Sequence, residues 1–153
     1  MRLSAGLCVA LSFALIAGLT GCASTPQASQ ARDDEAKQFG SNPATSTVYV
    51  YRTDTADDDG VLWIDGRLIG STLPRTYFRV HLDPGRHLIT GMAADNGRIA
   101  LETRPGKVYF VSVAMHAGQS NFQQIPAETA RKVVVTCCSL LENWVPGQRP
   151  LLR

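Results

Sequence analysis

The sequence predicts a mainly β fold: a small antiparallel β-sandwich or open sheet with one C-terminal helix. Between residues 47 and 115, short runs rich in β-branched and aromatic residues alternate with turn-forming residues. After Pro126 the apolar residues recur at helical spacing instead. Residues 47–153 also have about the length at which a single hydrophobic core forms without metals or disulfides, so we expect one globular domain there.

The N-terminal segment is predicted to be a signal peptide covering residues 1–21. The chain has one early cation, Arg2, and then runs from Leu3 to Leu19 without a charged residue. A short basic start followed by an apolar run is typical of a secretory signal. A membrane span would need basic residues just downstream, and the first cation after the run is Arg32. The pattern therefore favours export over membrane insertion.

The segment LTGC, residues 19–22, resembles the lipobox of bacterial lipoproteins. The resemblance implies a thioether-linked diacylglycerol on Cys22, cleavage before this residue, and acylation of the new N-terminus. The alternative is a buried or disulfide-bonded cysteine, for which the flanking sequence is unsuited. Ala23 and Ser24 follow, and by resemblance to the known sorting pattern the absence of Asp there implies anchoring at the outer membrane, facing the periplasm.

After the lipidated cysteine, residues 22–46 are predicted to form a disordered tether. They are mostly Ser, Thr, Gln, Ala, Pro and charged residues, with Phe39 as the only large apolar residue. Such a composition buries too little surface to offset the entropy of ordering the chain. A flexible chain of this length reaches about 25 to 30 Å.

The strand predictions depend on local pattern and turn chemistry. Four turn signals separate the runs: residues 65–66, 83–85, 96–97 and 105–106. Asp65 and Gly66 suit the positive φ angles of a type I′ turn, which predicts a tight hairpin there. The predicted strands cover residues 47–53, 61–65, 67–71, 77–83, 86–94, 98–104 and 107–115.

The C-terminal part carries two competing signals. One face of a helix beginning near Pro126, with Glu128 in its first turn, would gather Ala130, Val133, Val134, Cys137 and Leu141. The run VVVTCC is β-branched enough to form a strand instead, so both alternatives stay open for residues 126–141. A proline-interrupted tail follows Trp144.

Residues 47–141 resemble the bacterial lipoprotein family known as domain of unknown function 2846. The best-matching points are Asp65-Gly66, the Pro-Gly-Arg-His segment at residues 84–87, and the Gly-Lys-Val-Tyr segment at residues 106–109. The segments IDG-x-x-IG-ST and DPGRH are also similar to PEGA-type β-domains. These motifs are turns and core strands, so the resemblance implies a fold and no established activity.

Metal sites are not predicted. The histidines His81, His87 and His116 have no Cys or carboxylate at a recognisable ligand spacing, which favours partly exposed strand positions. The acidic loop with Asp57 and Asp59 has Thr and Gly where an EF-hand needs Asp and Glu, so it is predicted to be a turn.

Catalytic residues and cofactors are not predicted either, because no hydrolase elbow or complete phosphate-binding loop occurs in the sequence. Cys137 and Cys138 are adjacent, and a bond between neighbours would close a strained eight-membered ring. We therefore expect Cys137 to be buried and Cys138 to be more exposed. Trp63 lies within a predicted strand, where core packing is expected.

The protein is expected to be held at the membrane by its lipid and to act by non-catalytic contact with another envelope protein. An edge strand or the tail beginning at Trp144 would supply the contact surface. A second hypothesis is a module that binds glycan or an anionic polymer through Arg79 and Arg86. The net charge of +2 neither favours nor excludes an anionic partner, and no nucleic-acid partner is expected.

A third hypothesis is an enzyme of unrecognised type. It would require one or more of the three histidines to cluster with Asp83 or Asp95.

Overall fold

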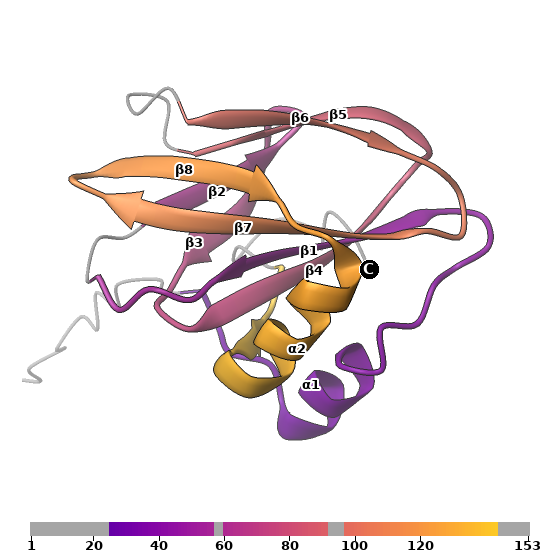
Figure 1. Ribbon diagram of the computed structural model, residues 1–153, viewed down its shortest axis with the longest axis horizontal. Helices are drawn as coiled ribbons and strands as arrows, with labels where there is room; N and C mark the ends of the chain where they lie inside the picture. The colour runs from indigo at the N-terminus through magenta and orange to yellow at the C-terminus, as the bar shows by residue number, and fades with distance from the viewer. Residues whose placement is uncertain (1–24, 57–59, 92–96, 144–153) are drawn as a thin grey trace, which may run out of the picture.

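The molecule is built in three layers, and the computed structural model describes residues 25–56, 60–91 and 97–143. Two helices cover one face of a five-stranded sheet, and a four-stranded sheet packs on the opposite face (Figure 1). The predicted mainly β class with a C-terminal helix is confirmed, and the sandwich is open. Among the described residues, no helix is long and apolar enough to cross a membrane.

The five-stranded sheet is mixed, with the strand order β8-β7-β1-β4-β9. The central strand β1 is antiparallel to β4 and parallel to β7, while β8 is antiparallel to β7 and β9 is parallel to β4. The bounds are β1 Ser46–Arg52, β4 Thr76–Leu82, β7 Val108–His116, β8 Gln119–Gln124 and β9 Ser139–Leu141. All seven residues of β1 are buried because both faces of this strand are covered.

The four-stranded sheet is antiparallel throughout, with the order β3-β2-β5-β6. The predicted hairpin joins β2 to β3 through Asp65 and Gly66, whose φ angles of 52° and 74° are those of a type I′ turn. The bounds are β2 Gly60–Ile64, β3 Arg67–Thr72, β5 Gly85–Thr90 and β6 Arg98–Thr103.

Two hydrophobic cores lie on the two faces of the five-stranded sheet. The first fills the space between the sheets and includes Val48, Val50, Leu62, Ile64, Phe78, Val80, Ile89, Leu101 and Val111. The second lies between the five-stranded sheet and the helices and includes Ala36, Tyr49, Tyr77, Phe110, Ala130 and Val134. Alternate residues of β1 and β4 contribute to the two cores, as the pleat of a strand requires.

The C-terminal helix is α2, Ala127–Cys137, so the helical alternative for this segment is correct. It begins after Pro126 with Glu128 in its first turn, and it buries Ala130 and Val134. Leu141, which the helical spacing placed on the same face, lies in β9 instead.

The prediction of a disordered tether is wrong for residues 25–46. This segment contains a helix, α1, Gln30–Ala36, which buries Asp33 and Ala36 against the five-stranded sheet. Composition indicated disorder because the segment has few apolar residues. The structure shows that hydrogen bonds and a few buried side chains hold it in place, as described below.

The predicted turn at Asp83 and Pro84 connects the two sheets. It joins β4 of the five-stranded sheet to β5 of the four-stranded sheet, so it is a crossing between layers and not a hairpin. His81 and His87 are therefore not cross-strand neighbours: His81 pairs with Thr47 of β1, and His87 pairs with Leu101 of β6.

Candidate functional site

The buried carboxylate of Asp33 fastens α1 to the sheet. Its Oδ1 accepts hydrogen bonds from the Tyr77 hydroxyl and from the Leu140 backbone nitrogen, both at 2.8 Å, and its Oδ2 lies 2.7 Å from Lys37 Nζ. Burial alone would raise the pKa of Asp33, but the hydrogen bonds from Lys37, Tyr77 and Leu140 outweigh it, so the pKa lies below its ordinary value. The carboxylate is therefore charged and fully paired.

A second polar contact joins α1 to β4. Arg79 donates two hydrogen bonds to Glu35, from Nη1 to Oε1 at 2.8 Å and from Nη2 to Oε2 at 2.9 Å. The hydrogen bonds lower the pKa of Glu35 and raise the pKa of Arg79. The side chain of Arg79, which was predicted to be a possible contact residue, is thus paired with Glu35 of the same molecule.

Aromatic packing completes the attachment of the N-terminal segment. The ring of Phe39 meets Tyr49 edge to face at a centroid distance of 5.2 Å, and it meets Phe110 in the same way at 5.5 Å. The Tyr49 hydroxyl donates to the Ala36 carbonyl oxygen at 2.6 Å. Burial raises the pKa of Tyr49 to about 12, so this donor keeps its proton at physiological pH.

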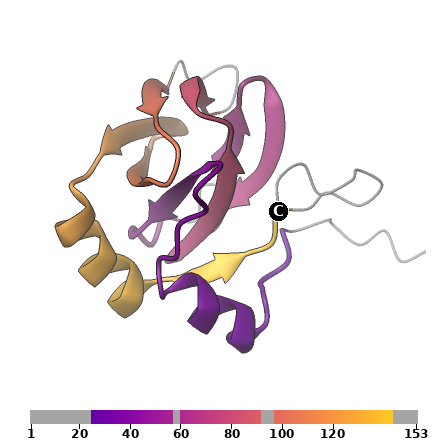
Figure 2. The same ribbon diagram turned by 90° about the vertical axis from the view of Figure 1, so that its right-hand side faces the viewer.

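Residues 25–28, here called the N-terminal strap, run along β9 before α1 begins. The backbone nitrogen of Ala28 donates to the Leu140 carbonyl oxygen at 2.9 Å, and the Glu142 nitrogen donates to the Pro26 carbonyl oxygen at 2.8 Å. The first and last described segments of the chain therefore lie side by side, as the indigo and yellow ends of the ribbon show in Figure 2.

The strap also reaches the other sheet. The Oγ1 of Thr25 accepts a hydrogen bond from the Ser71 backbone nitrogen in β3 at 2.8 Å. Gly70 makes room for this contact, because a Cβ there would lie 2.9 Å from the Phe78 ring and 3.0 Å from Thr25 Oγ1. The strap thus links β9, an edge of one sheet, to β3, an edge of the other.

Of the predicted contact residues, Arg79 and Arg86 are not brought together. Arg79 alternates with the core residues Phe78 and Val80, so it lies on the face of the five-stranded sheet that the helices cover. Arg86 is exposed on the outer face of the four-stranded sheet, opposite Glu102 of β6. The other two predicted site residues, Cys22 and Trp144, lie outside the described residues.

The three histidines occupy different places. The Nδ1 of His81 lies 3.2 Å from Thr47 Oγ1 at the start of β1, whereas His116 ends β7 at the far end of the same sheet. Burial and the nearby Arg79 lower the pKa of His81. No group of three or more His, Cys, Asp or Glu side chains in the described ranges is placed to hold a metal ion.

His87 is part of a structural contact at the β2–β3 hairpin. Its Nδ1 lies 2.7 Å from Asp65 Oδ2, and its Nε2 lies 2.7 Å from the backbone carbonyl oxygen of Asp83. Asp65 Oδ1 also accepts from the Leu88 nitrogen at 2.8 Å. The contact with Asp83 is therefore through its backbone, and Asp95 lies outside the described residues, as do Asp57 and Asp59 of the acidic loop.

A buried arginine near that loop was not predicted. The Arg52 side chain is fully buried, and its Nε donates to Asp54 Oδ1 at 2.7 Å while Nη1 donates to the Thr72 carbonyl oxygen at 3.2 Å. Asp54 Oδ2 accepts from the Met115 nitrogen at 3.1 Å. Burial would raise the pKa of Asp54, but these hydrogen bonds lower it. The sequence gives no sign of this hydrogen-bond network, because a single Arg at the end of a strand is usually exposed to solvent.

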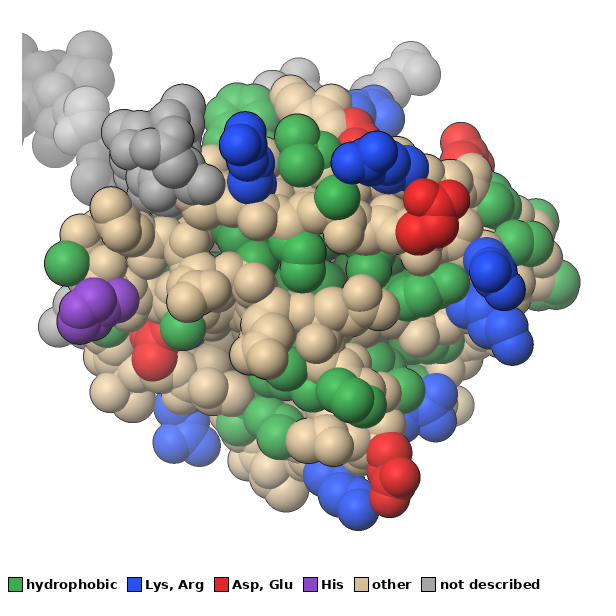
Figure 3. All heavy atoms as spheres, turned by 45° about the horizontal axis from the view of Figure 1, so that its top comes forward, with side chains coloured by type: hydrophobic (Ala, Val, Ile, Leu, Met, Phe, Trp, Pro, Cys, Tyr) green, Lys and Arg blue, Asp and Glu red, His purple; other side chains and the backbone are tan. Residues whose placement is uncertain are grey.

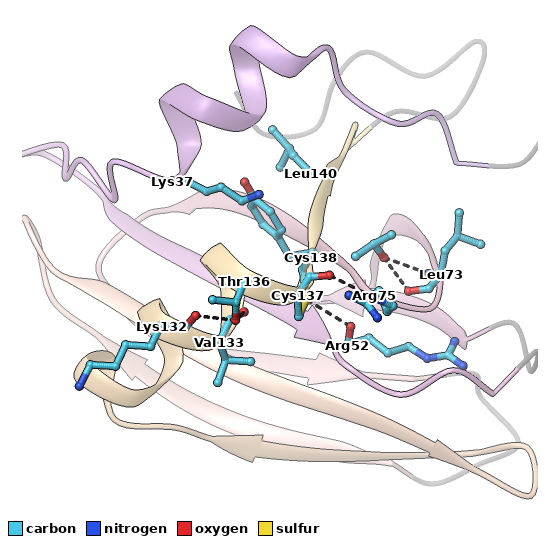
Figure 4. The surroundings of a disulfide bond; sticks show 12 residues. Lys37, Arg52, Leu73, Arg75, Lys132, Val133, Thr136, Cys137, Cys138 and Leu140 are labelled. Atoms are coloured by element: carbon cyan, nitrogen blue, oxygen red, sulfur yellow. Dashed lines mark hydrogen bonds between the residues drawn. A yellow bond between two sulfur atoms is a disulfide. The ribbon is translucent and has the colours of Figure 1, made fainter.

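The two adjacent cysteines form a disulfide at the end of α2, which differs from the expectation that ring strain disfavours a bond between neighbours (Figure 4). Cys138 is buried, with 4% of its surface exposed, and Cys137 is only half-buried, so the predicted order of exposure is wrong. The reason is that the helix ends at Cys137, and the extended residue Cys138 turns inward toward β9. Its sulfur lies 3.5 Å from the Arg52 carbonyl oxygen, to which a reduced thiol would donate.

Trp63 lies on the outer face of the four-stranded sheet and not in the core. Its neighbours Leu62 and Ile64 point into the core, and Trp63 pairs with Leu68 and Thr90 on the opposite face. Leu88 is 44% exposed on this face. The prediction was wrong because Trp63 occupies the outward position of an alternating strand.

An open groove of about 310 Å³ lies where β7 begins, β8 ends and α2 starts. The chain turns away from the sheet at Pro126, which leaves the first residues of β7 beside the groove. Its lining consists of Val108, Tyr109, Phe110, Gln124, Ile125, Pro126 and Ala127. The lining is mixed, with polar and apolar surface in similar amounts, and it includes Gln124, the last residue of β8.

Comparison with known proteins identifies a relative by sequence similarity. No family model matches the chain, and no solved structure matches it. The chain is 30% identical over 125 residues to an uncharacterised protein of Haemophilus influenzae, and the match covers 76% of this chain and 74% of the relative. The chain therefore belongs to the same family as this uncharacterised Haemophilus influenzae protein.

Proposed function

We propose that the protein is an envelope lipoprotein that is anchored through acyl chains on Cys22 and acts by non-covalent contact with another envelope component. The observation that carries this proposal is the uncharged run at residues 3–19 that ends in LTGC, three residues before the domain begins at Thr25. Each buried methylene contributes about 0.8 kcal/mol, so several acyl chains hold a protein stably at a membrane. The outer membrane is the expected location, by resemblance to the lipoprotein sorting pattern.

The resemblance of residues 47–141 to the domain of unknown function 2846 lipoproteins supports the same assignment. The motifs that match between this chain and that family are turns and core strands, so the property that they share is the folded scaffold. A scaffold held at a membrane raises the effective concentration of a weak contact without adding any new interface. We therefore assign the function to a surface and not to a reaction.

The contact surface that we favour is the outer edge of β8. Edge strands present unpaired backbone groups, and proteins usually protect them with charges, bulges or a covering segment. The strap covers β9 and contacts β3, and β6 carries Arg98 and Glu102. In contrast, β8 has the sequence QSNFQQ, which contains no charge, Pro or Gly.

The surroundings of β8 suit a contact with an extended polypeptide. Figure 3 shows hydrophobic and uncharged side chains in the middle of the face over β6 and β8, with the coloured charged groups toward its margin. Asn121 and Gln123 are exposed, and the groove begins at Gln124, which is part of its lining. Main-chain pairing with residues 121–124 would supply affinity, and the groove would accept a side chain of the partner.

Photo-crosslinking in the native envelope tests this assignment. A photoreactive residue replaces Gln123 in the full lipidated chain, and a matched variant carries it at Arg86, which is exposed on the other sheet. We expect one dominant protein adduct from position 123 that is absent from position 86. Equal adducts from both positions, or none from position 123, would contradict an interaction through β8.

A second candidate function is binding of glycan or an anionic polymer on the outer face of the four-stranded sheet. Arg86 and Arg98 are exposed there without ion pairs to described residues. Trp63 lies on the same face, because Thr90 pairs with both Trp63 and Arg98. Arg86 and Arg98 replace the predicted pair Arg79 and Arg86, because Arg79 lies on the helix-covered face of the other sheet and is paired with Glu35. Binding to isolated cell wall should then weaken with salt and with the Arg86→Ala and Arg98→Ala changes together.

A further inference from the structure

The distance between the proposed lipid anchor and the folded domain is limited by the covalent chain. Cys22 precedes Thr25 by three residues, and three residues span at most about 11 Å. Thr25 is buried, and its side chain is hydrogen-bonded to Ser71 of β3. Whatever conformation the intervening residues take, the acylated residue lies within that distance of the strap.

Orientation follows from this limit. A tether of about 25 residues would have let the domain tumble above the membrane, whereas this connection spans no more than about the 10 Å that separates two packed sheets. We propose that the strap side of the molecule, which consists of residues 25–28, β3 and β9, lies against the lipid headgroups of the bilayer. This inference rests on the proposed acylation of Cys22.

The chemistry of the strap side fits a headgroup surface. Arg67 begins β3 and Arg75 follows it, and both are exposed without an ion pair to described residues. Pro26 and Gln27 are exposed and uncharged, and Glu142 is already paired with Arg32. Basic groups without an ion pair are attracted to anionic lipids when they lie near a membrane.

The chain leaves the described region on the same side. Glu142 is hydrogen-bonded to Pro26, and residues 144–153 follow directly. Their sequence, WVPGQRPLLR, combines a tryptophan, two adjacent leucines and two arginines, which are residue types enriched at membrane interfaces. The proposed anchor and this segment thus join the domain at neighbouring points.

The opposite side of the molecule would then face away from the bilayer. In the five-stranded sheet, β8 lies at the far edge from β9, with β7, β1 and β4 between them. Neighbouring strands are about 4.8 Å apart, so the two edges are separated by roughly 19 Å. The orientation therefore presents the β8 edge to partners.

Lipid crosslinking in reconstituted vesicles tests the orientation. The full acylated chain is inserted into vesicles of phosphatidylethanolamine and phosphatidylglycerol, with a photoreactive residue at Gln27 or, as the matched control, at Gln123. Both positions are exposed in the structure. We expect lipid adducts severalfold more abundant from position 27 than from position 123. Equal yields would overturn the proposed orientation.

Two further measurements separate this inference from the proposal on which it rests. Intact mass before reconstitution shows whether Cys22 is acylated, and an unacylated protein would contradict the proposed function itself. A variant with a long Gly-Ser insertion between Ser24 and Thr25 keeps the anchor but frees the domain. The preference for position 27 should disappear in this variant, and a preference that survives would overturn the short connection as its cause.

Discussion

The carboxylate of Asp33 accepts a hydrogen bond from the backbone nitrogen of Leu140 at 2.8 Å, across 107 residues of sequence. The same oxygen accepts a hydrogen bond from the Tyr77 hydroxyl, so one buried group joins the first helix, the inner strand β4 and the last strand. The carboxylate stabilises the fold by satisfying these buried donors. If it were removed, each donor would stay buried without a hydrogen bond, which costs free energy of folding.

The first prediction concerns the removal of this carboxylate. Asp33→Ala leaves the Leu140 nitrogen and the Tyr77 hydroxyl unpaired, and we expect a loss of about 3 kcal/mol in the free energy of unfolding. Asp34→Ala is the matched control, because that side chain is exposed and should change stability by less than about 0.5 kcal/mol. Urea denaturation measures both, and similar losses would show that Asp33 has no special part in stability.

The second prediction concerns acid. The pKa values of Asp33, Glu35, Asp54 and Asp65 all lie below their ordinary values in the folded protein. A carboxyl with a lowered folded pKa contributes stability above its unfolded pKa of about 4, and this contribution is lost as the pH falls through the folded pKa.

We therefore expect the Tm to fall steeply as the pH drops below about 4, with a smaller slope in Asp33→Ala than in the parent. Thermal melts followed by circular dichroism at several pH values measure both slopes. Identical slopes would mean that Asp33 binds protons equally in the two states.

The third prediction concerns the contact between the N-terminal strap and β3. Gly70→Ala brings a Cβ to 2.9 Å from Phe78 and 3.0 Å from Thr25, and Phe78 is too tightly buried to move. We expect a loss of about 1 to 3 kcal/mol and faster hydrogen exchange in residues 25–28. Gly40→Ala, which meets nothing within 4 Å, is the control. Unchanged exchange in the strap would contradict the contact with β3.

The fourth prediction separates the two arginines. Arg79→Ala removes the paired hydrogen bonds to Glu35, whose side chain is 61% exposed, so solvent screening limits the loss to about 1 kcal/mol or less. Arg86→Ala should leave stability within about 0.5 kcal/mol of the parent. Hydrogen exchange of α1 should accelerate in the first variant alone, and equal acceleration in both would refute a specific role of Arg79.

The fifth prediction concerns the cysteine pair. In the oxidised protein we expect neither Cys137 nor Cys138 to react with iodoacetamide under native conditions. After reduction, Cys137 should react faster, because Cys138 is buried beside the Arg52 carbonyl group. Fragmentation of the labelled peptide in tandem mass spectrometry shows which of the two cysteines carries the label. Faster labelling of Cys138 would contradict its inward orientation.

Most of the strands could be predicted because their signals are local. Each of the seven predicted runs overlaps a strand, with bounds that differ by one or a few residues, and Asp65-Gly66 forms the expected turn. The strand β8 was missed because five of the six residues in QSNFQQ are polar, as expected for an edge with little burial. The strand β9 has only three residues and follows a helix directly, which is too short for a periodic pattern.

Long-range features could not be predicted. The segment around α1 has a composition typical of disorder, and its order comes from partners such as Tyr77 and Leu140, which are far away in sequence. The crossing at Asp83 and Pro84 has the same residues as a hairpin turn, and only the packing of the two sheets distinguishes them. Arg79 was named from its charge, while its partner Glu35 lay in the supposed tether.

The position of β9 has a consequence for the timing of assembly. In a chain that emerges N-terminus first, the strap has no strand to lie on until residues 139–142 arrive, because its backbone partners are Leu140 and Glu142. Closing a loop of that length is slow compared with the formation of a local hairpin. The backbone groups of the strap therefore stay exposed until the last strand has been made, and they become protected only when synthesis of the domain is complete.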